Sequence, residues 1–170
     1  MITTVIIGEK IMSSSNEAYS LNEKSSYGEK IGGKIHYSPT ETLYLQENKK
    51  LVVIEGKKEL SHEQLLRKLQ RKNKRITINY PVYKDLRNRG HIVKTGLKYG
   101  AEFRVYKKGT NMGKDHAEWV LYPVREEEKT GWQEFSSKNR VAHSTKKKLL
   151  IAVVDDEERV TYYEVLWKKL

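Results

Sequence analysis

The sequence predicts a mixed α/β (α+β) fold in which a small N-terminal α+β domain precedes a second domain built on a mixed β-sheet flanked by helices. Capping-box patterns mark helix starts, and short runs of Val, Ile and Leu bounded by turn residues mark strands. These two kinds of pattern alternate along 170 residues, of which 37% are hydrophobic. The chain is therefore long enough for one ordinary domain or two small ones.

The first segments of the chain give strand and loop signals. Residues 5–11 (VIIGEKI) predict one short strand. The stretch at 13–34, rich in Ser, Asn, Gly and Lys, predicts strands and loops.

Two capping boxes then predict two helices. Ser38 with Glu41, and Pro39 at the first helical position, open a short helix before a strand at 51–55 (LVVIE). Ser61 with Gln64 opens a second helix, and the apolar stripe of that helix is supplied by Leu65, Leu66 and Leu69. The N-terminal domain is expected to span residues 1–75.

A helix beginning at Pro81 is expected to open the second domain, at residues 76–170. Val82 and Leu86 are four residues apart, and Gly90 suits a left-handed helix end. Strands are predicted at 91–94, 102–106 and 116–124, the last two joined by a glycine-containing loop at 107–114.

The C-terminal third is predicted to contain a helix and a β-hairpin. Thr130 with Gln133 is expected to cap a helix that runs through Arg140 and His143 toward Lys147. A strand at 149–154, an acidic turn at 155–158 and a strand at 160–167 then follow.

Composition favours a polyanionic partner and excludes thiol chemistry. Lys and Arg number 33 against 22 Asp and Glu, which gives a net charge of +11. The same charge content is also typical of a thermophile's solvated surface. Cysteine is absent, which excludes disulfides, zinc ribbons and thiolate nucleophiles. The longest apolar run, at 149–154, is far shorter than a membrane helix, and residues 1–12 lack a signal-peptide layout. We therefore expect a soluble, cytoplasmic protein without membrane association.

Tyr106, His116 and Lys147 form a candidate set for cleaving RNA through its own 2′-hydroxyl. That reaction needs a base, an acid for the departing 5′-oxygen, and positive charge at the phosphorus. Tyr106 and His116 would meet at one end of the sheet, and Arg140 and Lys147, seven residues apart, would share one stripe of a continuing helix. Each residue also has an ordinary interpretation, as a packing tyrosine, a surface histidine or a solvated lysine run. His143 is an alternative acid.

Several segments together resemble one known family. They are, in order, 83–89 (YKDLRNR), 90–100 (GHIVKTGLKYG), 103–106 (FRVY), His116 with its strand, and 140–151 (RVAHSTKKKLLI). In this order they resemble the catalytic domain of the archaeal tRNA-splicing endonucleases. The resemblance covers residues 80–170 strongly and the N-terminal domain more loosely through 41–66. It implies that the second domain is the catalytic nuclease domain.

The resemblance implies an activity and assigns roles to the candidate set. Such enzymes cut precursor tRNA at bulge-helix-bulge motifs without metal or cofactor, and leave a 2′,3′-cyclic phosphate and a 5′-hydroxyl. By position, Tyr106 would be the general base, His116 the general acid, and Lys147 the group that stabilises the transition state. Because the ordinary pKa of tyrosine is ~10, Lys147 would have to lie close enough to favour the tyrosinate. A noncatalytic RNA-binding or structural subunit is the rival interpretation.

The resemblance also implies RNA-binding and assembly residues. A flipped bulge base would be clamped between Arg140 and Trp167, although Trp167 can equally be read as a core residue. The acidic turn Asp155, Asp156, Glu157 and Glu158 would insert into a neighbouring subunit and hold a homotetramer together. Arg159, directly after the four acids, departs from an all-acidic turn.

Overall fold

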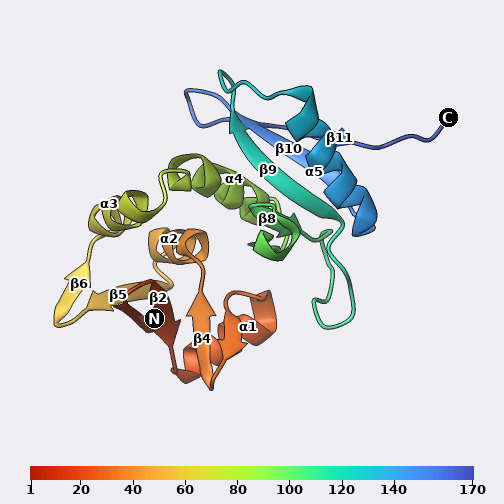
Figure 1. Ribbon diagram of the computed structural model, residues 1–170. Coiled ribbons are helices and arrows are strands. Elements are labelled where there is room, and N and C mark those ends of the chain that lie inside the picture. Colours follow the sequence, from red (N-terminus) through yellow and green to blue (C-terminus); the bar gives the residue numbers. More distant parts are fainter. The chain divides into compact units, whose positions relative to one another are not determined.

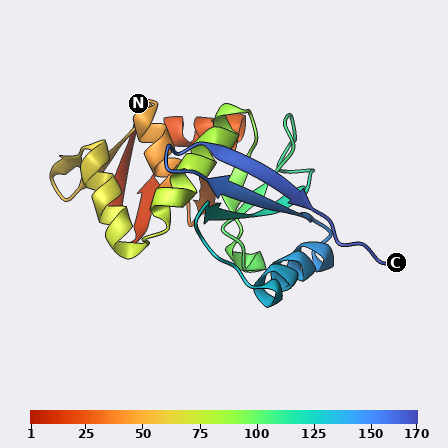
Figure 2. The same cartoon turned by 90° about the horizontal axis from the view of Figure 1, so that it is seen from above.

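The computed structural model describes all 170 residues, and the chain divides into two compact units, Met1–Tyr80 and Pro81–Leu170. Each unit is built on one β-sheet, as Figures 1 and 2 show. The predicted mixed α+β class is confirmed, with two mixed sheets and five helices. No helix has the length and apolar character that a membrane crossing requires.

The first unit contains a six-stranded sheet with the strand order β3-β4-β2-β1-β5-β6. β1 and β5 are parallel, and every other neighbouring pair is antiparallel. Its elements are β1 (Ile2–Ile7), β2 (Lys10–Ser13), α1 (Asn16–Ser25), β3 (Glu29–Ile31), β4 (Lys34–Tyr37), α2 (Pro39–Glu47), β5 (Leu51–Glu55), β6 (Lys58–Leu60) and α3 (His62–Lys72).

One face of this sheet carries the core of the first unit. Ile2, Thr4 and Ile6 alternate with exposed neighbours along β1, as expected when only one face of a strand is covered. The hydroxyl of Thr4 donates to the carbonyl of Val52 at 2.8 Å, so this buried polar group is satisfied. α2 covers the same core with a continuous buried segment, residues 40–45.

Both predicted capping boxes of the first unit are confirmed. The Ser38 hydroxyl accepts from the Glu41 N–H at 3.3 Å, and the Glu41 carboxylate accepts from the Ser38 N–H at 3.0 Å. Ser61 and Gln64 make the same reciprocal pair at 3.2 and 3.1 Å. An N-cap side chain typically contributes about 1 kcal/mol to helix stability.

One expectation for the first unit is wrong, and a second, for residues 13–34, holds for the strand β3 but misses a helix. Residues 5–11 belong to two antiparallel strands, because Gly8, with a φ of +61°, turns the chain between β1 and β2. The stretch at 13–34 contains helix α1, which is capped by Ser15 through the N–H of Ala18 at 3.2 Å. Ala18 is the buried residue of α1, so the helix presents almost no apolar stripe for a sequence pattern to detect.

The second unit contains a five-stranded sheet with the order β11-β10-β9-β8-β7. β9 and β10 are parallel and are connected through α5, while the other pairs are antiparallel. Its elements, including α4, which begins in the first unit, are α4 (Ile76–Asn88), β7 (Val93–Thr95), the short 3₁₀ helix η1 (Leu97–Tyr99), β8 (Phe103–Val105), β9 (Trp119–Arg125), α5 (Trp132–Ser144), β10 (Lys148–Val154) and β11 (Val160–Val165).

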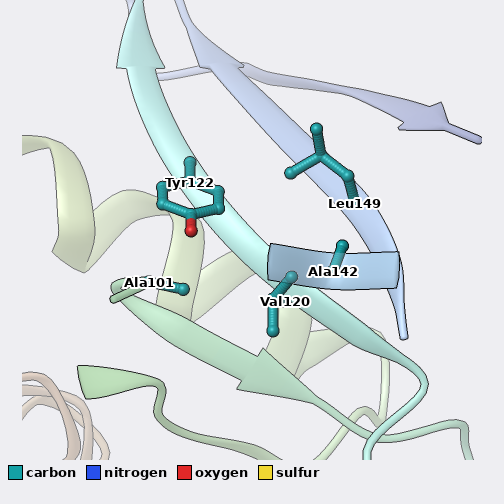
Figure 3. Close-up of a cluster of buried hydrophobic side chains, with 5 residues drawn as sticks. All are labelled: Ala101, Val120, Tyr122, Ala142 and Leu149. Carbon is teal, nitrogen blue, oxygen red and sulfur yellow. The ribbon is translucent and has the colours of Figure 1, made fainter. Parts of the chain in front are cut away.

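Helices lie on both faces of this second sheet. On one face, Ala142 of α5 packs with strand and loop residues in a buried cluster, drawn in Figure 3 and completed by Ala101, Val120, Tyr122 and Leu149. On the other face, Tyr83 of α4 contacts Phe103 of β8, with ring centroids 6.0 Å apart. Asp85 of α4 accepts a hydrogen bond from the Tyr162 hydroxyl on β11 at 2.7 Å.

The helix expected to begin at Pro81 begins at Ile76 instead. Pro81 therefore lies inside α4, where a proline removes one backbone donor. Ile76 and Val82 are both buried, so packing holds the helix together on either side of the proline. The predicted end at Gly90 is confirmed, since Gly90 has a φ of +90° and follows the last helical residue, Asn88.

The ends of α5 also differ from the prediction. Its N-cap is Gly131 without a side-chain cap, so the Thr130–Gln133 capping box is wrong. α5 ends at Ser144, and Lys146 has a φ of +56°, which excludes a helical stripe joining Arg140 to Lys147. The strand at 149–154 and its hairpin with the last strand are confirmed.

Candidate active site

Three chain segments that carry the predicted catalytic residues meet at one end of the second sheet. We call this end, where the strands start or stop, the edge of the sheet. β8 ends where β9 and β10 begin, because β8 is antiparallel to β9 and β9 is parallel to β10. Tyr106 directly follows β8, and Lys147 directly precedes β10. His116 lies before β9, which starts at Trp119, so the expectation that His116 begins the strand is wrong.

Backbone hydrogen bonds join these three segments through Glu118. The Glu118 N–H donates to the carbonyl of Val105 at 2.9 Å, and the Glu118 carbonyl accepts from the Lys148 N–H at 2.9 Å. Glu118 therefore lies between the residue before Tyr106 and the residue after Lys147. The pairing of β10 with β9 and of β9 with β8, rather than a shared helix, brings Lys147 to the edge that holds Tyr106.

The three predicted catalytic side chains have different surroundings. Tyr106 is 5% exposed, and its carbonyl oxygen lies 2.9 Å from Nδ1 of His91. His116 is exposed. Lys147 is partly buried, donates to the Thr145 carbonyl at 3.3 Å, and holds its ammonium 4.9 Å from the ring centroid of Tyr99. Tyr99 is thus an aromatic contact of Lys147 that the sequence had not indicated.

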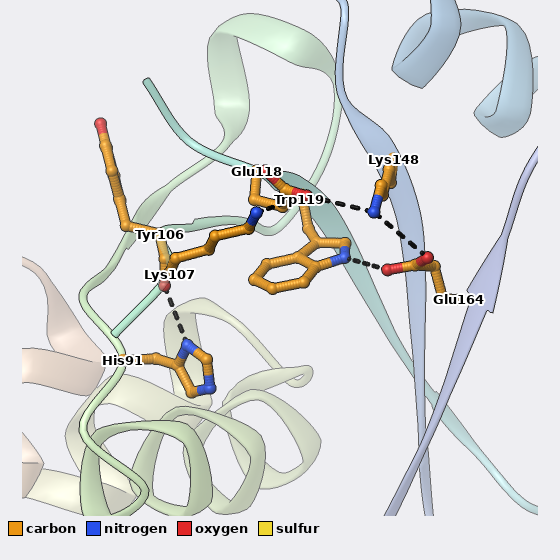
Figure 4. Close-up of polar contacts among 7 residues, drawn as sticks. All are labelled: His91, Tyr106, Lys107, Glu118, Trp119, Lys148 and Glu164. Carbon is orange, nitrogen blue, oxygen red and sulfur yellow. Dashed lines mark hydrogen bonds and ion pairs between the residues drawn. The ribbon is translucent and has the colours of Figure 1, made fainter. Parts of the chain in front are cut away.

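A network of ion pairs and hydrogen bonds connects the strand ends beside this edge (Figure 4). The Glu118 carboxylate lies 3.5 Å from the Lys107 ammonium and 3.2 Å from the Lys148 ammonium. Lys148 also lies 3.4 Å from Glu164, which accepts the Trp119 indole N–H at 2.7 Å. The hydrogen bond with Glu118, reinforced by the charges of Glu164 and Glu118, raises the pKa of Lys148.

His91 completes the network on the Tyr106 side. Its Nδ1 faces a carbonyl oxygen, which only accepts, so the proton of this hydrogen bond lies on Nδ1 of His91. Its ring stands edge-on to Trp119, with centroids 5.9 Å apart. Figure 4 shows the Tyr106 ring extending away from this contact. His91 therefore fixes the backbone of Tyr106 through its carbonyl, while the phenol ring extends in another direction.

Sequence reasoning missed His91, Tyr99, Glu118, Trp119 and Glu164. Trp119 and Glu164 are 45 residues apart, and His91 and Tyr106 are 15 apart, so no local pattern connects these pairs. The one available signal was the position of Glu118 and Trp119, two and three residues after His116 in the segment HAEW.

The predicted RNA-clamping residues are both accessible. Arg140 is exposed on α5. Trp167 is 52% exposed and lies beyond the end of β11, so its interpretation as a core residue is wrong. Its ring meets that of His143 edge-on, with centroids 4.3 Å apart. His143 and Arg140 are three residues apart on α5 and therefore share a face of the helix.

The acidic turn between β10 and β11 is organised by its own hydrogen bonds. Asp155 accepts from the backbone N–H groups of Arg159 and Glu157, both at 2.9 Å, and from the Arg159 side chain at 2.9 Å. The backbone N–H of Arg159, followed by the Arg159 guanidinium, lowers the pKa of Asp155. Arg159 also lies 3.2 Å from Glu157. The side chains of Asp156 and Glu158 are both exposed and make none of these contacts.

The chemistry at the sheet edge is that of a phenol, an imidazole and an ammonium. These groups can accept a proton, donate a proton and stabilise negative charge. No cluster of three or more His, Asp or Glu side chains in the chain is arranged to hold a metal ion.

Comparison with known proteins identifies the class to which this fold and site belong. Residues 76–162 match the family described as the tRNA intron endonuclease, catalytic C-terminal domain, and residues 2–66 match the N-terminal domain of the same enzymes. The chain is therefore an endonuclease with a separate N-terminal domain and a catalytic C-terminal domain. It belongs to the tRNA intron endonuclease family, as the sequence resemblance predicted.

Individual relatives agree with this assignment over nearly the full length of the chain. The tRNA-splicing endonuclease of Thermococcus kodakarensis is 36% identical over 170 residues, covering 99% of each protein. That of Thermococcus onnurineus is 38% identical over 95% of this chain and 94% of the relative. That of Methanothermobacter thermautotrophicus is 43% identical over 86% of this chain and 85% of the relative.

Proposed function

We propose that this endonuclease excises introns from precursor tRNA by cutting at bulge-helix-bulge motifs in the cytoplasm. Each cut would use the 2′-hydroxyl of the RNA as nucleophile and leave a 2′,3′-cyclic phosphate and a 5′-hydroxyl, without a metal ion or cofactor. The observation that carries the proposal is the meeting of the Tyr106, His116 and Lys147 segments at one sheet edge. The net charge of +11 supports a polyanionic substrate.

In this scheme the protons and bonds balance without any further reactant. Tyr106 takes the proton of the 2′-hydroxyl, and the 2′-oxygen forms a bond to phosphorus. The bond from phosphorus to the 5′-oxygen breaks, and His116 gives its proton to that departing oxygen. Lys147 stabilises the negative charge on the phosphoryl oxygens in the transition state.

Substrate positioning would come from exposed groups on and after α5. A bulge base held between the guanidinium of Arg140 and the indole of Trp167 would be stacked on two flat faces. The exposure of both side chains supports this role.

The assembly that we propose is a homotetramer of two-domain subunits, with the domains at 1–75 and 76–170. Asp155 and Glu157 are engaged by Arg159 within the turn. Asp156 and Glu158 would therefore supply the charge that meets a basic cleft of the neighbouring subunit.

The experiment that tests the proposal uses the purified chain, an end-labelled bulge-helix-bulge RNA and excess EDTA. Two cuts with cyclic phosphate ends are expected. Cleavage that stops in EDTA, or products with 3′-hydroxyl ends, would contradict the proposed mechanism. Tight binding without any cleavage would favour a noncatalytic RNA-binding subunit that acts with another chain.

A further inference from the structure

A pocket lies beside α5 in the second unit, on the face of the sheet that carries the buried cluster of Figure 3. Its volume is about 540 Å³, which is within the usual range for sites that hold a small organic group. We call it the tyrosine pocket and define it by Tyr99, Tyr122, Glu134, Ser137, Lys138 and Val141.

The walls of the tyrosine pocket change from apolar to polar between floor and rim. Tyr122 is 9% exposed and belongs to the buried cluster, and Tyr99 packs against that cluster. Ser137 and Glu134 are exposed on α5 at the rim. Such a pocket fits a flat group with an apolar face and polar edges, which describes a nucleobase.

Ammonium groups also gather at and beside the pocket. The Lys138 ammonium lies 5.0 Å from the ring centroid of Tyr122 and 2.6 Å from the carboxylate of Glu134. Lys98 and Lys147 lie 5.0 and 4.9 Å from the ring centroid of Tyr99. Glu134 pairs with Lys138, whereas Lys98 and Lys147 lie over Tyr99 without lining the pocket, so the excess positive charge lies beside Tyr99, where it suits a phosphate group.

This positive charge lowers the pKa of the Tyr99 phenol. Partial burial alone would raise its pKa, but the contact with Lys98 and the charges of Lys147 and Arg104 outweigh burial and lower it. A phosphate brought close to these lysines would meet the same positive field.

We propose that the tyrosine pocket binds one nucleotide of the RNA substrate, with its base against Tyr99 and Tyr122 and its phosphate against the lysines. Sites for single-stranded nucleic acid commonly pair aromatic faces with cations in this way. Lys147 would turn from the ring of Tyr99 to the phosphate, which frees that face of the ring for the base.

The position of the pocket links this nucleotide to the site of cleavage. Lys147 is both the cation over Tyr99 and the proposed transition-state stabiliser, so this inference rests on the proposed function. A nucleotide held in the pocket would lie next to the cleaved phosphate in the RNA chain. The Arg140 and Trp167 clamp would hold a different base, because neither residue lines the tyrosine pocket.

Filling the pocket is the first part of the test. Ser137→Trp places an indole at the rim, and the matched control Thr130→Trp adds the same group to an exposed residue that does not line the pocket. We expect Ser137→Trp to weaken binding of a bulge-helix-bulge RNA about 10-fold, as loss of one stacked base does. Thr130→Trp should bind like the wild-type chain. Unchanged RNA binding by Ser137→Trp at an unchanged Tm would overturn the inference.

Photo-crosslinking of the wild-type chain is the second part, and it does not depend on how any variant folds. The RNA carries 5-iodouridine at one position at a time, through each bulge and its flanking nucleotides. One position is expected to crosslink to Tyr99 or Tyr122, as identified by mass spectrometry. Crosslinks that reach neither tyrosine from any position would overturn the inference.

The two parts separate this inference from the proposed function. A wild-type chain that cuts the RNA but gives no tyrosine crosslink keeps the proposed function and loses the pocket. A position-specific crosslink without any cleavage keeps the pocket as an RNA site and contradicts the proposed function.

Discussion

The two ends of the second sheet differ in charge and in how they are held together. At one end, the segments after β8 and before β9 and β10 bring Tyr106, His116 and Lys147 to the same edge. At the other end, the turn after β9 carries acids at 126–128, and the turn after β10 carries acids at 155–158. The acidic turn is fixed by contacts between residues two and four positions apart, whereas the end that holds Tyr106, His116 and Lys147 depends on residues far apart in sequence.

This difference shows which end of the sheet is held by local contacts and which end depends on contacts between distant parts of the chain. The acidic turn satisfies its own backbone through Asp155, so it can form with little help from the rest of the chain. The candidate active site is organised around Glu118 and His91, which fix backbone and neighbouring side chains while His116 stays exposed. His116 would therefore be accessible to the RNA phosphate that we propose as its target.

Removing the proposed acid is expected to have the largest effect. His116→Ala should slow single-turnover cleavage by roughly 10²- to 10⁴-fold, because the 5′-oxygen would leave without a proton donor. RNA affinity should stay near the wild-type value, since His116 acts on the leaving group. The rate constant and the Kd are measured on the same bulge-helix-bulge RNA.

The alternative acid is tested in parallel with His143→Ala. His143 contacts Trp167, so we expect this variant to bind RNA less tightly and to cut bound RNA at close to the wild-type rate. If His143→Ala loses the chemical step and His116→Ala keeps it, the acid is His143.

Charge reversal at the acidic end should affect assembly and not chemistry. Changing Asp156 and Glu158 to Lys would place like charges in the proposed subunit contact, which costs several kcal/mol, or about 10²- to 10³-fold in association. Light scattering should then show dimers where the wild-type chain shows tetramers. These two acids test the contact more cleanly than Asp155 and Glu157, which also hold the turn together.

A matched control for the reversal lies in the neighbouring turn. Glu126→Lys with Glu127→Lys makes the same change in net charge on exposed residues at the same end of the sheet. This control should remain tetrameric. Tetramers that persist in the Asp156 and Glu158 variant would contradict the assembly role of the acidic turn.

Glu118 is expected to act as a positioning residue with a smaller effect. Glu118→Gln removes the charge that pairs with Lys107, the neighbour of Tyr106, and with Lys148, the neighbour of Lys147. We expect single-turnover cleavage to fall roughly 10-fold, since displacements near 1 Å can cost as much as about 100-fold. RNA affinity and Tm should not change, and Glu126→Gln is the control. A loss of RNA affinity as large as the loss of rate, or a lower Tm, would indicate a merely structural role.

Local chemistry made much of the fold predictable. The capping boxes at Ser38 and Ser61 and the glycine at Gly90 act through neighbouring residues, and all three predictions hold. The hairpin of the last two strands is equally local. Helix α1 was missed because its burial is slight, and the start of α4 was missed because packing tolerates Pro81 inside the helix.

The candidate site was less predictable because register and loop geometry build it. The residue types Tyr106, His116 and Lys147 could be named from the sequence through the resemblance. The position of Lys147 at this edge could not be predicted, since it depends on α5 ending at Ser144 and on the pairing of β9 with β10. Tyr99 beside Lys147 likewise follows from tertiary packing of η1.

The smallest predicted effect concerns the pH dependence of the acidic turn. Because hydrogen bonds from Arg159 lower the pKa of Asp155 in the folded chain, its contribution to stability is present above the unfolded pKa and is lost as pH falls through the folded pKa. Asp155→Asn should therefore have a lower Tm than the wild-type chain at pH 7, and the difference should begin to shrink as the pH falls below about 4 and close below the folded pKa of Asp155. Asp156→Asn removes a charge from the same turn without breaking the Asp155 contacts, so its Tm should follow that of the wild-type chain. A Tm difference for Asp155→Asn that is the same at pH 7 and pH 3 would mean that the turn is held by its backbone conformation and not by the Asp155 charge.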